Sequence, residues 1–156
     1  MKIDVTRRSF LVALTGSVAA FAALRPLAAQ TGTPIDVYKD PTCGCCTTWV
    51  AHMNANGFKA TVHEGPTGPV HTKYKIPTAL QSCHTGVAGS YVIEGHVPAA
   101  DVKRLLREKP AGVVGLTIPG MPQSAPGMDL KPFQSYTVLA FDAQGKTTVF
   151  AKHDKS

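Results

Sequence analysis

Alternating apolar and polar positions predict two short β-strands on either side of one helix. Residues 34–39 (PIDVYK) and 58–63 (FKATVH) alternate as strands with one buried face do. Between them, residues 43–56 read as a helix, for which Thr42 or Cys43 can serve as N-cap and Asn56-Gly57 as a left-handed stop. The pattern therefore predicts a β-α-β unit.

The next segments continue the alternation of strands and helices. They comprise a short helix over 70–76 that ends before Pro77, strands over 80–84 and 91–94, and a helix over 99–108 that Pro98 opens. Apart from the short helix, the predicted order is β-α-β-β-β-α, which is typical of a thioredoxin-like core in the α/β class. In that comparison Ile76-Pro77-Thr78 corresponds to a cis-proline turn that faces the cysteine loop.

The remaining segment is predicted to extend this core. Residues 111–132 are rich in Gly and Pro and read as an irregular loop, in which Pro-Gly-Met occurs at 119–121 and again at 126–128. Strands over 136–141 and 147–152 then form a hairpin that turns at 143–145. The predicted extension is thus a Pro/Gly-rich loop followed by a β-hairpin.

The first 29 residues have the features of an export signal. Thr6-Arg7-Arg8-Ser9-Phe10-Leu11 resembles the twin-arginine motif, which is an address and not an anchor. The apolar run after it has about 15 residues, short of the roughly 20 that span a bilayer. An uncleaved amphipathic anchor is the alternative. We expect cleavage near Ala29, a periplasmic location, no stable membrane anchor, and a single mature domain over 30–156.

Removal of this signal changes the charge balance. It takes away four basic residues and one acidic residue, so that 16 basic and 10 acidic residues become 12 and 9. No basic run and no interleaving of basic and aromatic residues remains in the mature part. Nucleic acid is therefore not an expected partner.

The cysteines carry the strongest chemical signal. Cys43, Cys45 and Cys46 stand at the start of the first predicted helix, where the helix dipole and unpaired N–H groups lower a thiol pKa. Thiolates bind soft metals and also attack disulfides. Cys43 and Cys46 form a Cys-x-x-Cys pair, which suits thiol–disulfide exchange, but the additional Cys45 favours metal binding in reduced form.

The fourth cysteine, Cys83, falls on or just past the third predicted strand. That strand should lie close to the cysteine helix, so four sulfur atoms can meet. Exported proteins commonly pair their cysteines, so a structural disulfide from Cys83 to the cluster is the competing interpretation. Four thiolates would also satisfy Zn²⁺.

Methionine and histidine side chains extend the candidate site. Thioether sulfur is a poor ligand for zinc and a good one for Cu(I), so the repeated Pro-Gly-Met favours copper, as one or several ions. Each of these methionines can equally be an apolar cover. The same alternatives, ligand or packing residue, hold for His52 and Met53 in the first predicted helix. The candidates beyond the cysteines are Met121, Met128, His84, His96, His52 and Met53. His63, His71 and His153 lack a partner pattern and are expected to face solvent.

Together these motifs resemble the CopG-type copper-resistance family. The resemblance rests on Pro41 to Cys46, on Ser82 to Thr85, on Glu94 to Pro98 and on the repeated Pro-Gly-Met. It implies a periplasmic protein with a thioredoxin-like core that binds copper and supports copper tolerance, with a change between Cu(I) and Cu(II). It also implies that Cys43, Cys45, Cys46 and Cys83 are metal ligands.

Three functional hypotheses follow. The first is a periplasmic protein that sequesters or handles Cu(I), with copper ions and other periplasmic copper-handling proteins as partners. The second is a thiol–disulfide oxidoreductase that uses Cys43 and Cys46. The third is a purely structural role for the cysteines, through zinc or disulfides. Whether the chain is an enzyme is left open, and no hydrolytic residue set is present in the sequence.

Overall fold

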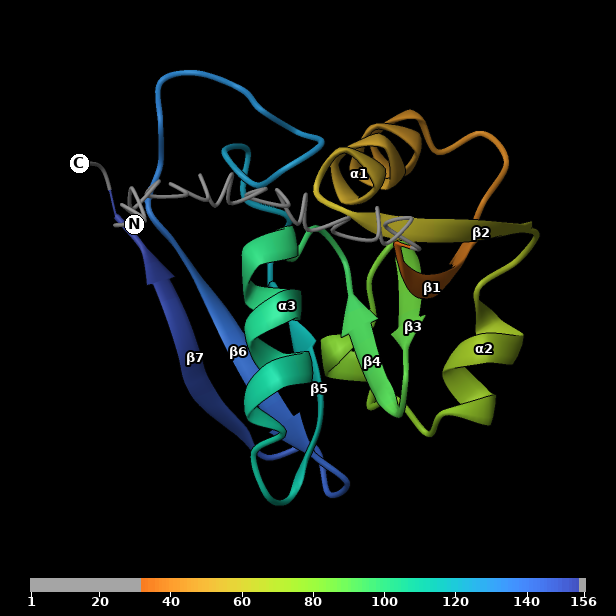
Figure 1. The fold of residues 1–156 in the computed structure, drawn as a ribbon, viewed down its shortest axis with the longest axis vertical. Coiled ribbons are helices and arrows are strands. Elements are labelled where there is room, and N and C mark those ends of the chain that lie inside the picture. The colour runs from red at the N-terminus through yellow and green to blue at the C-terminus, as the bar shows by residue number, and fades with distance from the viewer. Residues whose placement is uncertain (1–31, 155–156) are drawn as a thin grey trace, which may run out of the picture.

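A seven-stranded mixed β-sheet organises the part of the chain that the computed structural model describes, residues 32–154 (Figure 1). The predicted signal, residues 1–29, lies outside the described residues. Across the sheet the strands follow the order β2-β1-β3-β4-β5-β6-β7. Their bounds are β1 Thr33–Lys39, β2 Phe58–Glu64, β3 His84–Ala88, β4 Tyr91–Glu94, β5 Val113–Thr117, β6 Tyr136–Asp142 and β7 Thr147–His153. The helices are α1 Gly44–Ala55, α2 Gly68–Lys73, the 3-10 turn η1 Thr78–Leu80 and α3 Ala99–Glu108.

The predicted β-α-β unit forms the first part of the sheet. β1 and β2 pair in parallel, an arrangement that needs a crossover, and α1 supplies it. Cys43 is the N-cap of α1 and Asn56 its C-cap, and Gly57 adopts the left-handed conformation with φ of +81°. The sequence pattern thus located this helix correctly to within a residue at each end.

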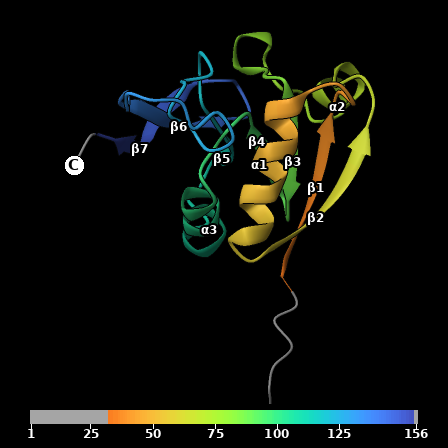
Figure 2. The ribbon, with the colours of Figure 1, turned by 90° about the horizontal axis from the view of Figure 1, so that it is seen from above.

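Side chains of β4 divide the core into two clusters. Ile93 packs into the large cluster with Trp49 of α1 and Leu105 of α3, whereas its neighbour Val92 packs with Ile76 and others on the opposite face. Successive residues of a strand point to opposite faces, so α1 and α3 cover one face of the sheet. Figure 2 shows these two helices on the same side, with α2 on the other. The start of α1 is thereby held over the strands that carry the rest of the site.

The predicted α/β class is confirmed, and the elements through α3 follow the predicted order, with α2 in the place of the short helix. The prediction of an irregular segment over 111–132 was wrong in part, because β5 forms within it. The pattern did not predict this strand because glycine, here Gly115, is uncommon in strands. A β-carbon at Gly115 would overlap the carbonyl oxygen of Val92 and lie 2.6 Å from the ring of Phe141, so glycine is required where β5 meets its neighbours.

Two further predictions about the third strand were wrong. The strand begins at His84 and not at Leu80, because residues 78–80 form a 3-10 turn first. Pro77 is not a cis-proline: within residues 32–154 the cis peptide bond is at Lys131–Pro132. Pro77 instead precedes the 3-10 turn and lies against Gly145 in the turn between β6 and β7. None of the helices described is long and apolar enough to cross a membrane.

Candidate metal centre

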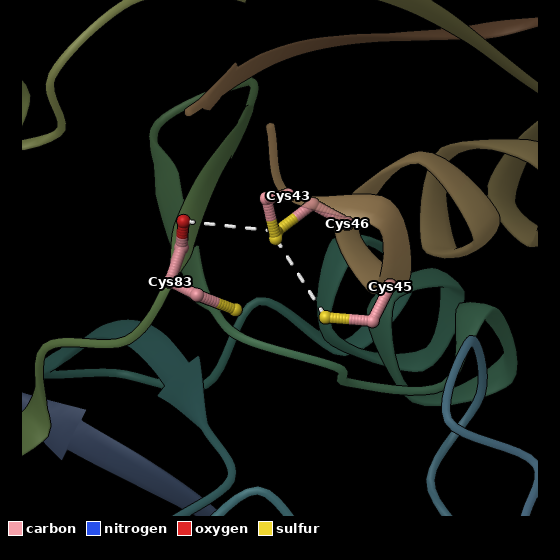
Figure 3. Close-up of side chains that lie close together, drawn as sticks. All are labelled: Cys43, Cys45, Cys46 and Cys83. Carbon is pink, nitrogen blue, oxygen red and sulfur yellow. Dashed lines mark hydrogen bonds between the residues drawn. A yellow bond between two sulfur atoms is a disulfide. The ribbon is translucent and has the colours of Figure 1, made fainter. Parts of the chain in front are cut away.

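Three cysteine sulfur atoms gather at the first turn of α1 (Figure 3). Cys43 and Cys46 are joined by a disulfide, with their Cα atoms 5.4 Å apart. Cys45 is free, and its Sγ lies 3.6 Å from Sγ of Cys43. The expectation that all these thiols are reduced therefore does not hold in this structure, which instead contains the pair proposed for thiol–disulfide exchange.

Cys83 reaches the same point from the sheet. It lies immediately before β3, and its carbonyl oxygen is 3.7 Å from Sγ of Cys46. The sulfur atoms of all four cysteines lie within 4.8 Å of one another. The interpretation in which Cys83 forms a structural disulfide is not borne out, because Cys83 is free. Burial raises the pKa of the Cys83 thiol, with a smaller opposing effect from the hydroxyl of Ser82.

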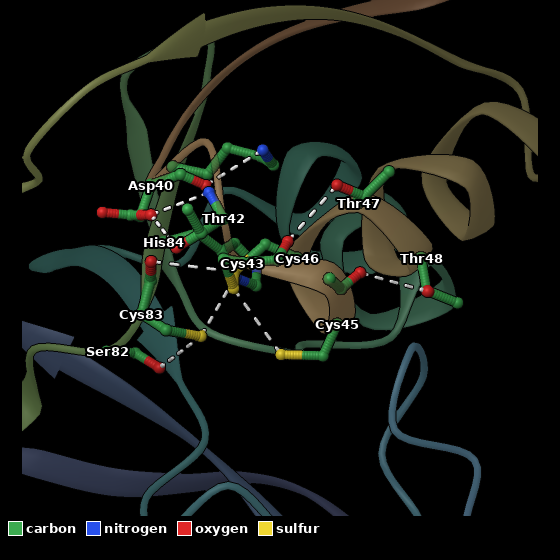
Figure 4. Close-up of a disulfide and its surroundings, with 12 residues drawn as sticks. Asp40, Thr42, Cys43, Cys45, Cys46, Thr47, Thr48, Ser82, Cys83 and His84 are labelled. Carbon is green, nitrogen blue, oxygen red and sulfur yellow. Dashed lines mark hydrogen bonds between the residues drawn. A yellow bond between two sulfur atoms is a disulfide. The ribbon is translucent and has the colours of Figure 1, made fainter.

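A short turn brings the chain from β1 to these cysteines (Figure 4). The backbone N–H of Thr42 donates to Oδ1 of Asp40 at 2.8 Å, and the N–H of Cys43 donates to the Asp40 carbonyl oxygen at 3.1 Å. Hydrogen bonds from the Thr42 hydroxyl and N–H lower the pKa of Asp40. The turn thus fixes where α1 begins, and with it the position of the cysteine cluster.

Two histidines form a second group around Cys83. Its Sγ lies 3.5 Å from Nδ1 of His84 and 3.7 Å from Nε2 of His96, and the two imidazole rings are edge to face at 4.9 Å. Nδ1 of His96 lies 2.8 Å from the carbonyl oxygen of Pro126. A carbonyl can only accept, so Nδ1 carries the proton and Nε2 is left with a lone pair toward Cys83.

His84 is completely buried, and its Nε2 has no hydrogen-bond partner. Burial, and to a lesser degree the neighbouring His96, lower the pKa of His84 to about 3. The pKa of His96 is also lowered, first by burial. Both imidazoles are therefore neutral near pH 7, the form in which they can ligate a metal. The two groups, of four cysteines and of Cys83 with both histidines, share the sulfur of Cys83.

The loop between β5 and β6 passes directly over this centre. A β-carbon at Gly127 would lie 2.8 Å from the backbone nitrogen of Trp49, 2.9 Å from the Cys45 carbonyl oxygen and 3.1 Å from Nδ1 of His96. Met128, the next residue, is half-buried, whereas Met121 is exposed. Of the two Pro-Gly-Met copies, the structure thus brings the second to the cysteine cluster.

The two helix candidates, Met53 and His52, make other contacts. Met53 is fully buried in the main core, where it packs with Trp49. Nε2 of His52 accepts a hydrogen bond from the N–H of Ala99 at 3.1 Å, at the first residue of α3. This lone pair satisfies a free N–H at the start of a helix, so it is not directed at the sulfur atoms. Burial lowers the pKa of His52.

Further residues, which no sequence motif indicated, support the centre. Nε1–H of Trp49 donates to the Val97 carbonyl oxygen at 2.9 Å, and its ring lies against His84. Glu94 is fully buried and accepts the N–H of Ser82, the residue before Cys83, and burial raises the pKa of Glu94 to about 7. The expectation that His71 faces solvent was wrong, since it is buried with Nε2 3.5 Å from Glu94. The sequence did contain one signal for the burial of Glu94, because this charged residue directly ends an apolar run that begins at Tyr91.

The fold and site together define an α/β protein with a cysteine- and histidine-rich candidate metal centre. Two solved structures resemble it closely, both titled copper resistance protein CopG. Form 1 is 39% identical, covers 80% of this chain and 99% of its own, and superposes with a TM-score of 0.73. Form 2 is 40% identical, covers 78% of this chain and 98% of its own, with a TM-score of 0.71.

Residues 80–128 also match a family described as "Protein of unknown function, DUF411". No curated protein matches the chain. The identity to the two solved structures extends over nearly their full length. The chain therefore belongs to the CopG copper resistance protein family.

Proposed function

We propose that this protein binds copper as Cu(I) in the periplasm and sequesters or handles it in copper resistance. The observation that carries the proposal is the convergence of four cysteine sulfur atoms within 4.8 Å, in a chain whose relatives are copper resistance proteins. Thiolate is a soft ligand that suits Cu(I). Two neutral imidazoles around Cys83 enlarge the donor set, so the centre offers ligand atoms for more than one ion.

The Cys43–Cys46 disulfide adds a redox aspect to the proposal. When reduced, this pair can give one electron to each of two Cu(II) ions. The two thiols then become a disulfide, two protons are released, and two Cu(I) ions remain for Cys45, Cys83 and the histidines. Oxidation thus leaves free thiols in the centre, as the structure has them.

Titration of the reduced protein tests copper binding. The full chain is expressed, and the mature protein is reduced and titrated anaerobically with Cu(I) against a chromogenic chelator. We expect tight binding that Cys45→Ser and Cys83→Ser each weaken by about tenfold or more, a typical effect of disturbing a metal site. Met128→Leu should weaken it less, and Met121→Leu serves as the matched thioether control. Weak binding, or full affinity in Cys45→Ser, would contradict the proposal.

Export is tested separately. Arg7 and Arg8 form the proposed twin-arginine address. In wild-type cells the protein should be found in the periplasmic fraction, and the conservative double change Arg7→Lys with Arg8→Lys should retain it in the cytoplasm. A periplasmic double variant would show that another route exports the chain.

A second candidate function is thiol–disulfide exchange. The Cys43–Cys46 disulfide at the start of α1 favours it, since helix N-termini stabilise the thiolate that such enzymes use. This function predicts disulfide reduction or oxidation of a substrate such as insulin without metal, and activity that survives Cys45→Ser. Loss of copper binding with no insulin activity in the same variant would decide for the copper proposal.

A further inference from the structure

Glu94 is a fully buried carboxyl group at the end of β4, and both of its oxygens are engaged by one short segment. Oε2 accepts the backbone N–H of Ser82 at 2.8 Å, and Oε1 accepts the hydroxyl of Thr85 at 2.6 Å. These two donors stand on either side of Cys83 and His84. A buried carboxyl group is costly unless it is hydrogen-bonded, so these two hydrogen bonds are what compensates the burial of Glu94.

The residues after Glu94 hold the same segment. The N–H of Gly95 donates to the His84 carbonyl oxygen at 3.1 Å, and Nε2 of His96 faces Sγ of Cys83 at 3.7 Å. Gly95 has φ of +72°, and a β-carbon there would lie 2.7 Å from Oγ of Ser82. Residues 94–96 and 82–85 therefore lie against each other at successive points.

Strand pairing alone does not explain the contact to Ser82. The β3–β4 ladder begins with Thr85 opposite Glu94, and β3 itself begins at His84. Ser82 and Cys83 therefore precede the strand, and the N–H of Ser82 finds its acceptor on the Glu94 side chain. Without that acceptor a half-buried backbone donor would lose its partner, and the Cys83 segment would be free to move away from the sheet.

We propose that Glu94 is a positioning residue for Cys83: its carboxyl group clamps Ser82 and Thr85 and so holds the Cys83 sulfur against the other cysteines and His96. The inference rests on the proposed copper function, because Cys83 is one of its ligands. The hydrogen bonds, and not the charge, do the positioning. Glutamine can accept from Ser82 and donate to Thr85, so it should replace Glu94 in this role, whereas leucine cannot.

Thiol alkylation tests the clamp without copper. In the metal-free, unreduced protein the free thiols are Cys45 and Cys83, so peptide mapping after iodoacetamide gives a rate for each. Glu94→Leu should speed alkylation of Cys83 several-fold and leave Cys45 unchanged. Glu94→Gln should restore the wild-type rate, and Glu108→Leu, at an exposed position of α3, should have no effect. Thr85→Val should give a smaller increase, and Thr85→Ser none.

Two outcomes would overturn the proposal. One is an unchanged Cys83 rate in folded Glu94→Leu, or in Thr85→Val if the leucine variant does not fold. The other is an equal acceleration in Glu94→Gln and Glu94→Leu. The reduced variants are then titrated with Cu(I), where Glu94→Leu should bind about tenfold more weakly than wild type and Glu94→Gln close to it. Absence of binding in the wild type would refute the copper function while the alkylation result still decides on the clamp.

Discussion

Nδ1 of His96 lies 2.8 Å from the carbonyl oxygen of Pro126, so the loop between β5 and β6, residues 118–135, determines which nitrogen of His96 faces Cys83. We call it the covering loop. The same loop places Gly127 against the first turn of α1. The candidate centre therefore depends on three separate parts of the chain, the helix with the cysteines, the sheet with Cys83, and this covering loop.

Gly127→Ala should displace the covering loop. Gly127 has φ of +89°, and a β-carbon would lie within 3.1 Å of three atoms of Trp49, Cys45 and His96. Left-handed backbone costs about 1–2 kcal/mol for a non-glycine residue. Overpacking adds about 1–3 kcal/mol. We expect a loss of about 3 kcal/mol in the free energy of unfolding, measured by denaturant titration, together with weaker Cu(I) binding.

Gly120→Ala is the matched control for this change. Gly120 has a similar φ of +76° in the same loop, but nothing lies within 4 Å of a β-carbon there. It should show the backbone cost alone, about 1–2 kcal/mol, and unchanged copper affinity. Equal effects of the two substitutions would mean that the close approach of Gly127 to α1 is unimportant.

Glu94 should make stability depend on pH in an unusual direction. Burial raises its pKa from 4.5 to about 7 in the folded protein. The folded state therefore holds a proton that the unfolded state releases between these values. The contribution of protonated Glu94 to the free energy of unfolding is complete below about pH 4.5 and is lost as the pH rises through about 7. Relative to Glu94→Gln, the wild type should lose about 3 kcal/mol over this range in urea unfolding. A constant difference would contradict the raised pKa.

His84 should act in the opposite direction. Burial and His96 lower its pKa from 6.5 to about 3, so the unfolded state binds the proton first as the pH falls. The contribution of neutral His84 is complete above about pH 6.5 and is lost toward about pH 3. Metal-free wild type should lose about 2 kcal/mol relative to His84→Gln between about pH 6.5 and about pH 5. By NMR, the imidazole of His84 should not titrate between about pH 5 and about pH 8, and a titration there would contradict its burial.

Trp49→Phe should destabilise the protein through a lost hydrogen bond and lost packing. Trp49 is fully buried, and its Nε1–H pairs with the Val97 carbonyl oxygen at 2.9 Å. Phenylalanine leaves that carbonyl unpaired and fills less space, which should cost about 2–4 kcal/mol in unfolding followed by circular dichroism. Phe133→Leu, at a ring that is 40% exposed, is the aromatic control and should change little. A comparably small loss in Trp49→Phe would mean that the Val97 carbonyl finds another partner.

Local signals in the sequence predicted much of this fold. The alternation in β1 and β2, the stop at Asn56-Gly57 and the turn before Gly145 depend on neighbouring residues, and the structure has these elements where they were expected. β5 was missed because Gly115 is dictated by Val92 and Phe141, which are distant in sequence. The cis form of Pro77 was inferred by analogy to another fold and was wrong. Pro77 instead contacts Gly145, which is distant in sequence, so no local signal indicated its position.

The sequence predicted those parts of the candidate site for which the type of side chain alone indicates metal binding. Clustered cysteines mark the start of α1, and His84 and His96 stand beside recognisable motifs. The proposed role of Glu94 was not predictable, since it depends on a contact between its side chain and the segment before β3, where the N–H of Ser82 lies 2.8 Å from Oε2. For the same reason the sequence could not distinguish Met128, which follows the Gly127 that lies against α1, from Met121, which occurs in the same Pro-Gly-Met context.

Both ends of the covering loop leave adjacent strands of one sheet, since Thr117 at the end of β5 pairs with Leu139 of β6 (Figure 1). The sheet therefore holds the two ends of the loop together, so the loop can open only by pivoting at these ends or by fluctuations between them. An ion beneath the loop would enter or leave through such an opening. The speed of metal exchange is thereby separated from the tightness of binding, so that a change such as Gly120→Ala can alter the first without altering the second.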